Sequence, residues 1–108
     1  MSMRDPGLDL LEWQTEREQL QPQLESEPAA VLPELSDLVG RMLEARGYAW
    51  NEQPTEEGQE PEFVREYRSA RDTAERADAG DADPGDVGDA IATLTTLYDD
   101  LVLERRAP

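Results

Sequence analysis

The stretch VLPELSDLVGRML, residues 31–43, decides the fold class of this chain. Its apolar residues fall into two adjacent rows at helical spacing. One row holds Val31, Leu35, Leu38 and Met42, and the other holds Leu32, Val39 and Leu43. Two adjacent rows make the wide apolar stripe of a helix that faces a core. We therefore predict a core-facing helix over residues 27–46, with Gly47 ending it.

Three further segments carry apolar residues at helical spacing. We predict helices over residues 8–25, 61–79 and 87–106. The apolar positions are Leu10, Trp13, Leu20 and Leu24 in the first, Phe63, Tyr67, Ala70, Ala74 and Ala77 in the next, and Val87, Ile91, Leu94, Tyr98 and Leu101 in the last. No strand pattern of useful length and no internal repeat is present. The 108 residues are therefore predicted to form one domain, an all-α up-and-down bundle of three to four helices.

Glycine and proline residues set the expected helix boundaries. Gly80 should close the third helix, because glycine readily ends a helix in the left-handed conformation. Pro22 should kink or end the first helix, since it removes a backbone donor. Ser26 is a candidate N-cap for the second helix. Pro33 interrupts the second segment, which leaves open a regular helix that begins only there.

The stretch DAGDADPGDVGD, residues 78–89, holds five aspartates in twelve residues. An EF-hand calcium loop needs glycine at its sixth position and a bidentate glutamate at its twelfth. Counted from Asp81, neither residue is present. We therefore predict an acidic helix–helix connection over residues 80–86. Asp86 would be the N-cap of the last helix, and Asp89 the acid of a capping box.

The composition excludes several chemistries. The chain carries 26 acidic and 10 basic residues, a net charge of -16, and all ten basic residues are arginines. Without His or Cys, it can form neither a tetrahedral zinc site nor a catalytic triad of the Ser-His-Asp kind. So acidic a surface repels nucleic acid and anionic lipid. We predict no catalytic residue, no metal, no cofactor, no direct nucleic-acid binding and no membrane contact.

The acidity has two explanations. One is adaptation to high salt, and the other is a surface made for a basic partner. The excess of acidic residues runs along the whole chain. This favours adaptation to high salt, because a binding surface needs charge on one face only. The N-terminal residues lack an apolar signal region, and no run approaches the roughly 20 apolar residues that span a bilayer. We therefore expect a cytoplasmic protein.

Residues 47–60, GYAWNEQPTEEGQE, form the longest stretch without a helical pattern. Aromatic residues that no helical stripe explains are interface candidates, because Tyr and Trp are enriched in binding hot spots. We predict a partner-binding surface at this segment and the adjoining start of the third helix. Its residues are Tyr48, Trp50, Phe63 and Arg65. The alternative for Trp50 is that it folds back as a lid over the end of the bundle.

The segment EFVREYRSARDTAER, residues 62–76, holds four of the ten arginines. Such a cluster could bind an anion or an acidic peptide. Helical spacing favours internal ion pairs instead, because side chains four residues apart lie side by side on a helix. The expected pairs are Arg68 with Asp72, Arg71 with Glu75, and Asp72 with Arg76.

Two acidic pairs, Glu34 with Asp37 and Asp86 with Asp89, have an i, i+3 spacing. This resembles the paired carboxylates with which all-α nucleotide pyrophosphatases of the MazG kind hold magnesium. The resemblance implies a magnesium-dependent enzyme. That family clusters more carboxylates, and this chain lacks a cationic phosphate-binding cluster near either pair. Acids are also favourable in the first turns of helices, where both pairs are expected.

The leading hypothesis is therefore a small acidic non-enzymatic protein that acts through protein–protein contact. It could serve as an adaptor, an assembly chaperone or a subunit of a larger complex. The alternative is an acidic decoy, or DNA mimic, that binds a basic protein. The magnesium-dependent pyrophosphatase is ranked third. A homodimer also fits, because short bundles with Ala-rich faces often pair.

Overall fold

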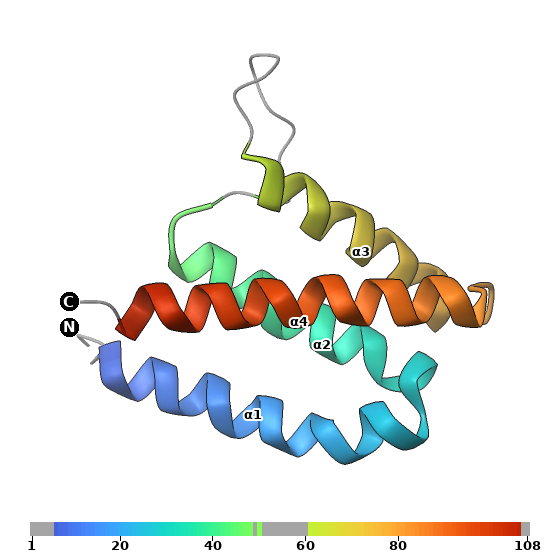
Figure 1. Ribbon diagram of the computed structural model, residues 1–108, viewed down its shortest axis with the longest axis horizontal. Helices are drawn as coiled ribbons and strands as arrows, with labels where there is room; N and C mark the ends of the chain where they lie inside the picture. The colour runs from blue at the N-terminus through green and yellow to red at the C-terminus, as the bar shows by residue number, and fades with distance from the viewer. Residues whose placement is uncertain (1–5, 49, 51–60, 107–108) are drawn as a thin grey trace.

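The computed structural model describes residues 6–48, 50 and 61–106 (Figure 1). This part of the chain forms four helices and contains no strand, which confirms the predicted all-α bundle. The helices are α1 (Pro6–Ser26), α2 (Pro28–Ala45), α3 (Glu62–Asp78) and α4 (Pro84–Arg106). None of them is long and apolar enough to cross a membrane, as far as the described residues go.

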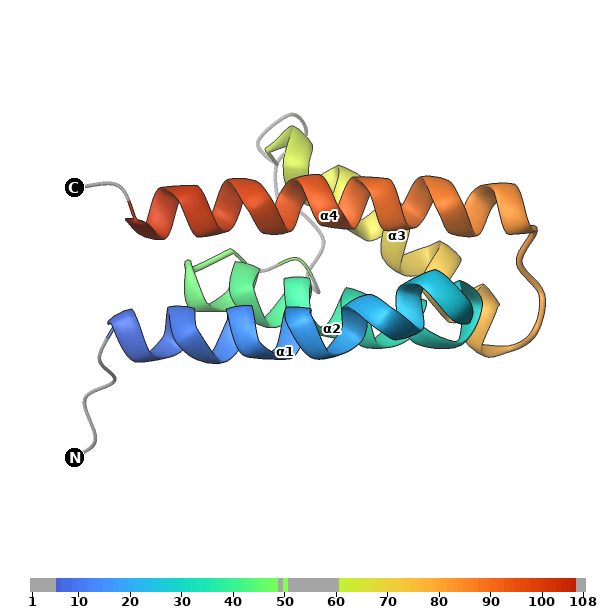
Figure 2. The same ribbon diagram turned by 60° about the horizontal axis from the view of Figure 1, so that its bottom comes forward.

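Helix α2 is the centre of the bundle. It packs against all three other helices, and α2, α3 and α4 also pack closely on one another. Helix α1 packs almost entirely against α2 and touches α4 only marginally. Figures 1 and 2 show α1 and α4 running along the length of the molecule, with α3 inclined to both. The fold is therefore a three-helix core with a fourth helix laid against its central member.

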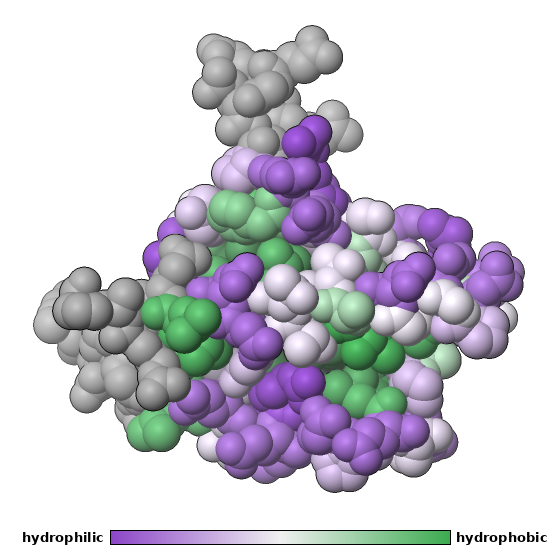
Figure 3. Space-filling model, viewed as in Figure 1, coloured by the Kyte–Doolittle hydropathy of each residue, from purple (hydrophilic) through white to green (hydrophobic). Residues whose placement is uncertain are grey.

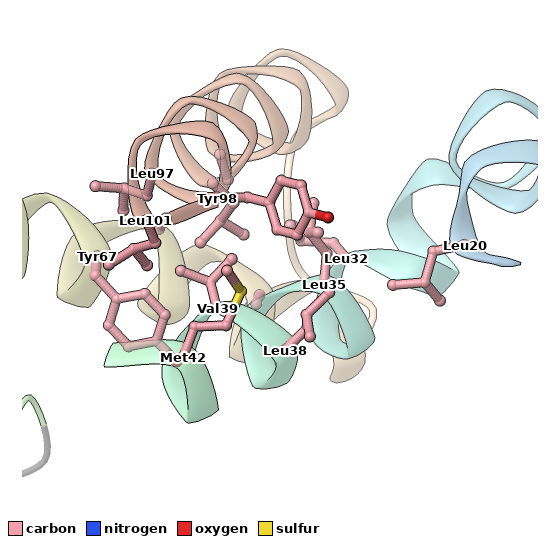
Figure 4. Close-up of a cluster of buried hydrophobic side chains, with 14 of the residues drawn as sticks. Leu20, Leu32, Leu35, Leu38, Val39, Met42, Tyr67, Leu97, Tyr98 and Leu101 are labelled. Atoms are coloured by element: carbon pink, nitrogen blue, oxygen red, sulfur yellow. The ribbon is translucent and has the colours of Figure 1, made fainter. Parts of the chain in front are cut away.

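The two predicted apolar rows of α2 form the middle of the core. All seven of their residues, from Val31 to Leu43, are at most 2% exposed. Figure 4 shows Leu20 of α1 and Tyr98 of α4 near the Leu32 side of α2, whereas Tyr67 of α3 lies beside Met42. The wide stripe exists because α2 must meet neighbours on several sides at once.

The expectations based on proline and serine need correction. Pro22 does not end α1, which continues to Ser26, and Pro33 lies inside α2, which begins at Pro28. The carbonyls that these prolines leave without a helical donor belong to Glu18 and Ala29, four residues earlier. Both residues are exposed, so water can satisfy them.

Ser26 is not the N-cap of α2. It is the last residue of α1, and its hydroxyl donates to the Pro22 carbonyl at 3.1 Å. The N-cap is Glu27, whose side chain makes no capping bond, and Pro28 occupies the start of α2. Proline suits that position because its fixed φ matches the helix and its missing donor is not needed there.

Two glycines end helices as predicted. Gly47 has φ 91°, and its N–H donates to the Glu44 carbonyl at 2.9 Å. The next residue, Tyr48, donates to the Leu43 carbonyl at 3.0 Å. These two bonds define a Schellman motif. The same pair of bonds recurs at the end of α3, where Gly80 has φ 77°.

The acidic connection between α3 and α4 is shorter than predicted. Helix α4 begins at Pro84 rather than beyond Asp86, so Asp86 lies in its first turn and is not its N-cap. The Val87 N–H already donates to the Asp83 carbonyl at 3.0 Å. Proline favours the first turn of a helix, which explains the earlier start. The negative charge of Asp86 still lies at the favourable end of the helix dipole.

Candidate functional site

An aromatic corner lies where α2 ends and α3 begins. We use this name for Tyr48, Trp50, Phe63 and Tyr67. The Schellman turn at Gly47 carries the chain out of α2 and places Tyr48 against Phe63, with ring centroids 4.8 Å apart and an interplanar angle of 88°. This edge-to-face arrangement is the one that aromatic pairs prefer. Both side chains remain half-buried.

Trp50 is held against the bundle by its ring and by its indole nitrogen. Its ring lies 5.1 Å from that of Tyr67, at an interplanar angle of 64°. Its Nε1–H donates to the Gly40 carbonyl on α2 at 3.0 Å. Its own carbonyl accepts a 2.6 Å hydrogen bond from Arg68 Nε on α3. Trp50 therefore ties α2 to α3 although it belongs to neither helix.

Arg71 lies over the ring of Trp50. Its guanidinium carbon lies 4.3 Å from the centroid of the Trp50 ring, a distance typical of a cation–π interaction. Arg71 Nη1 donates to the Tyr67 hydroxyl at 3.0 Å. The same side chain lies 3.5 Å from Asp37 on α2 and 3.6 Å from Glu75 on α3. Arg71 thus joins the aromatic corner to carboxylates on two helices.

Gly40 makes this packing possible. Tyr67 is fully buried, and its hydroxyl donates to the Ser36 carbonyl at 2.8 Å. A Cβ atom at position 40 would overlap the Tyr67 hydroxyl and lie 3.3 Å from Cζ2 of Trp50. Glycine costs a helix interior about 1 kcal/mol relative to alanine. Its presence in α2 is explained by the close approach of the two aromatic rings.

Burial raises the pKa of Tyr67 above its usual value, although hydrogen bonds with Ser36 and Arg71 oppose the shift. The pKa of Tyr98 is raised as well, chiefly by burial. Because neutral tyrosine is the form that fits the folded protein, ionisation at high pH should favour the unfolded chain. The chain has neither Lys nor Cys, so few other side chains change charge in the same pH range.

We expect the free energy of unfolding to fall as the pH rises above about 10, where tyrosine in the unfolded chain loses its proton. The contribution of the buried tyrosines is complete below that pH and is lost as the pH passes through their raised pKa values. In Tyr67→Phe the free energy of unfolding should fall less steeply with pH, by at most about 1.4 kcal/mol per pH unit. Urea unfolding midpoints measured through this alkaline range test the prediction, and an unchanged slope in Tyr67→Phe would contradict it.

The structure brings together three of the four residues predicted as a partner-binding surface. Tyr48 and Phe63 touch, and Trp50 lies in the same corner with its indole turned toward α2. Arg65 is exposed on the first turns of α3. Sequence reasoning missed the contribution of Gly40, although an isolated glycine inside a helical pattern is a signal for a close packing contact.

The arginines of α3 make internal pairs. Two of the three pairs predicted from helical spacing form, Arg71 with Glu75 and Arg76 with Asp72. For Arg68, the third arginine of that prediction, Nε donates to the Trp50 carbonyl. Arg71 also reaches Asp37 on α2, a contact between helices that spacing along one helix does not predict.

The acidic pairs named in the sequence lie on different parts of the bundle. No group of three or more acidic residues in the described ranges is placed to hold a metal ion. Asp86 and Asp89 line a groove of about 540 Å³ between α3 and α4, whose other walls are mainly Ala, Ser and Thr.

No family model, no curated protein and no solved structure matches this chain.

Proposed function

We propose that this protein is a non-enzymatic helical module that acts through protein–protein contact at the aromatic corner. The supporting observation is the Tyr48–Phe63 pair, which is half exposed and held in one geometry by the packing behind it. A partner that binds a preorganised aromatic surface loses little conformational entropy on binding. Adaptor, assembly chaperone and complex subunit are roles that such a contact can serve.

The charge around the corner favours approach by another protein. Helix α3 carries five acidic and four basic residues and is close to neutral, whereas α1 carries five acidic residues and one arginine. A partner without strong positive charge therefore meets less repulsion at α3 than at α1. Arg65, exposed on α3 two residues after Phe63, can pair with a carboxylate of that partner.

We also propose that the acidity is an adaptation to a salty cytoplasm. Acidic residues outnumber arginines on every helix, three to one on α2 and five to two on α4. A surface made for one basic partner needs excess charge on one face only. An excess of acidic residues on all four helices supports adaptation to salt over the acidic decoy.

Capture experiments with matched charge variants test the corner. Wild-type protein, Arg65→Glu and Arg76→Glu would be immobilised and exposed to an extract of the source cells, in low salt and in molar KCl. Both variants change the charge of an exposed arginine on α3 by the same amount. We expect Arg65→Glu to lose a specific partner that the wild type and Arg76→Glu retain, because charge reversal within a contact costs binding.

Equal capture by all three proteins would overturn the assignment of the contact to the corner and the adjoining Arg65. Capture that fades steeply with KCl and ignores both substitutions would instead point to the general acidic surface, as the decoy hypothesis expects. Circular dichroism of each variant at the same salt checks that the bundle is intact.

A further inference from the structure

Helix α1 is attached to the bundle more weakly than the other helices. It packs on α2, touches α4 marginally and does not contact α3 within the described residues. Three of its described side chains are buried, Trp13, Leu20 and Leu24, and each remains 6–8% exposed. Figure 3 shows apolar surface in the band between α4 and α1. Helix α1 thus covers one side of α2 without being enclosed by a second helix.

Polar contacts position α1 on this side of the core. Glu16 pairs with Arg41 of α2, and both side chains are partly exposed. The Arg17 guanidinium lies 5.9 Å from the centroid of the Tyr98 ring on α4. Exposed ion pairs of this kind contribute little to stability. They orient α1 correctly without making its attachment strong.

The connection between α1 and α2 is a single residue outside helical geometry. Glu27 has φ -139° and ψ 65°. Its N–H donates to the Gln23 carbonyl of α1 at 2.7 Å, and its carbonyl accepts from Ala30 and Val31 of α2. Antiparallel helices are more often joined by 2–5 residues. Short hinges of this kind favour the exchange of an element between copies of a chain.

We propose that two copies of this chain exchange α1. Rotation about Glu27 would release α1 from its own α2 and seat it on α2 of the second copy. Trp13, Leu20 and Leu24 would then fill the positions that they fill within one chain. Glu16 would pair with Arg41 of the partner subunit. The exchanged dimer keeps the native contacts of α1, so the cost of forming it lies in association and charge.

The charge makes the exchange dependent on salt. Each copy carries a net charge of -16, and α1 itself carries five acidic residues and one arginine. The Debye length falls from about 30 Å at 0.01 M salt to about 3 Å at 1 M. We therefore expect a monomer at low salt and a growing fraction of dimer at molar KCl. The dimer fraction should also rise with protein concentration.

Cross-linking between two single-cysteine variants tests the exchange, because the natural chain has no cysteine. Glu16→Cys and Arg41→Cys proteins would be mixed in molar KCl, equilibrated and treated with a short bismaleimide. A covalent heterodimer forms efficiently only if α1 of one chain lies on α2 of the other. The control mixes Glu18→Cys with Arg41→Cys, because position 18 is exposed on a different face of α1. Light scattering of the unmodified wild type gives the mass.

The expected result is a dimeric mass at molar KCl with several-fold more heterodimer in the Glu16→Cys mixture than in the control. Insertion of Gly-Ser-Gly after Glu27 should lower both, since a longer hinge lets α1 fold back on its own chain. A monomeric mass at every salt and protein concentration would overturn the proposal. A dimer with equal cross-linking in both mixtures would overturn it too, because the copies would then meet through another surface.

Discussion

Replacing Gly40 with valine should destabilise the protein by about 3 kcal/mol, a large part of the stability of a small domain. A Cβ atom at position 40 already overlaps the Tyr67 hydroxyl, and valine adds two further carbons. Tyr67 cannot yield easily, because it is fully buried and its hydroxyl is bonded to the Ser36 carbonyl. If the ring moves, the buried Tyr67 hydroxyl loses its acceptor, which costs about 1–3 kcal/mol.

Urea unfolding followed by circular dichroism measures this loss. The matched control is Gly88→Val, because Gly88 lies inside α4 and a Cβ atom there meets nothing within 4 Å. Valine has a slightly better helix propensity than glycine, so the control should change stability by less than about 0.5 kcal/mol. Similar effects of the two substitutions would show that Gly40 does not serve close packing.

The second large effect is expected for Leu35→Ala. Leu35 has no exposed surface and belongs to the row of α2 that lies at the centre of the core. Leucine-to-alanine substitutions at such sites cost about 2–5 kcal/mol, because they remove apolar burial and leave a cavity. We expect a loss of about 3 kcal/mol, measured as a lower urea midpoint with an unchanged slope.

Leu11→Ala provides the comparison for this loss. Leu11 is 60% exposed on α1, so truncation removes little burial, and alanine is a favourable helix residue. Its effect should stay within about 0.5 kcal/mol. If Leu35→Ala cost no more than Leu11→Ala, the core would have to lie elsewhere than on the two rows of α2.

The fold was predictable because one segment is unambiguous. Residues 31–43 place two apolar rows on one helix, and such a pattern can be satisfied only by neighbours on several sides. The glycines also predicted two helix ends correctly, because glycine adopts a positive φ whatever packs around it. Prolines inside the apolar patterns predicted helix boundaries poorly. Helices continue through Pro22 and Pro33 because the carbonyls that lose a donor belong to exposed residues.

The candidate site was predictable only in part. The Tyr48–Phe63 contact follows from a helix end and a helix start that are joined by one connection. The orientation of Trp50 depends on how closely α2 and α3 approach at Gly40, which is set by the packing of the whole bundle. Arg71 contacts Asp37 on α2, Glu75 on α3 and the Trp50 ring, which belongs to neither helix. Spacing along α3 predicted only the contact with Glu75.

The central position of α2 also shapes how the sequence can change over evolutionary time. A substitution on α2 must suit three neighbouring helices at once, whereas one on α1 must suit little more than α2 itself. Drift should therefore be slow in the rows of α2 and fast along α1. A distant relative would be recognised by these rows, by a glycine in the place of Gly40 and by a tryptophan ten residues after it. On the proposal that the acidity is an adaptation to salt, the charge would be a poor guide to such a relative.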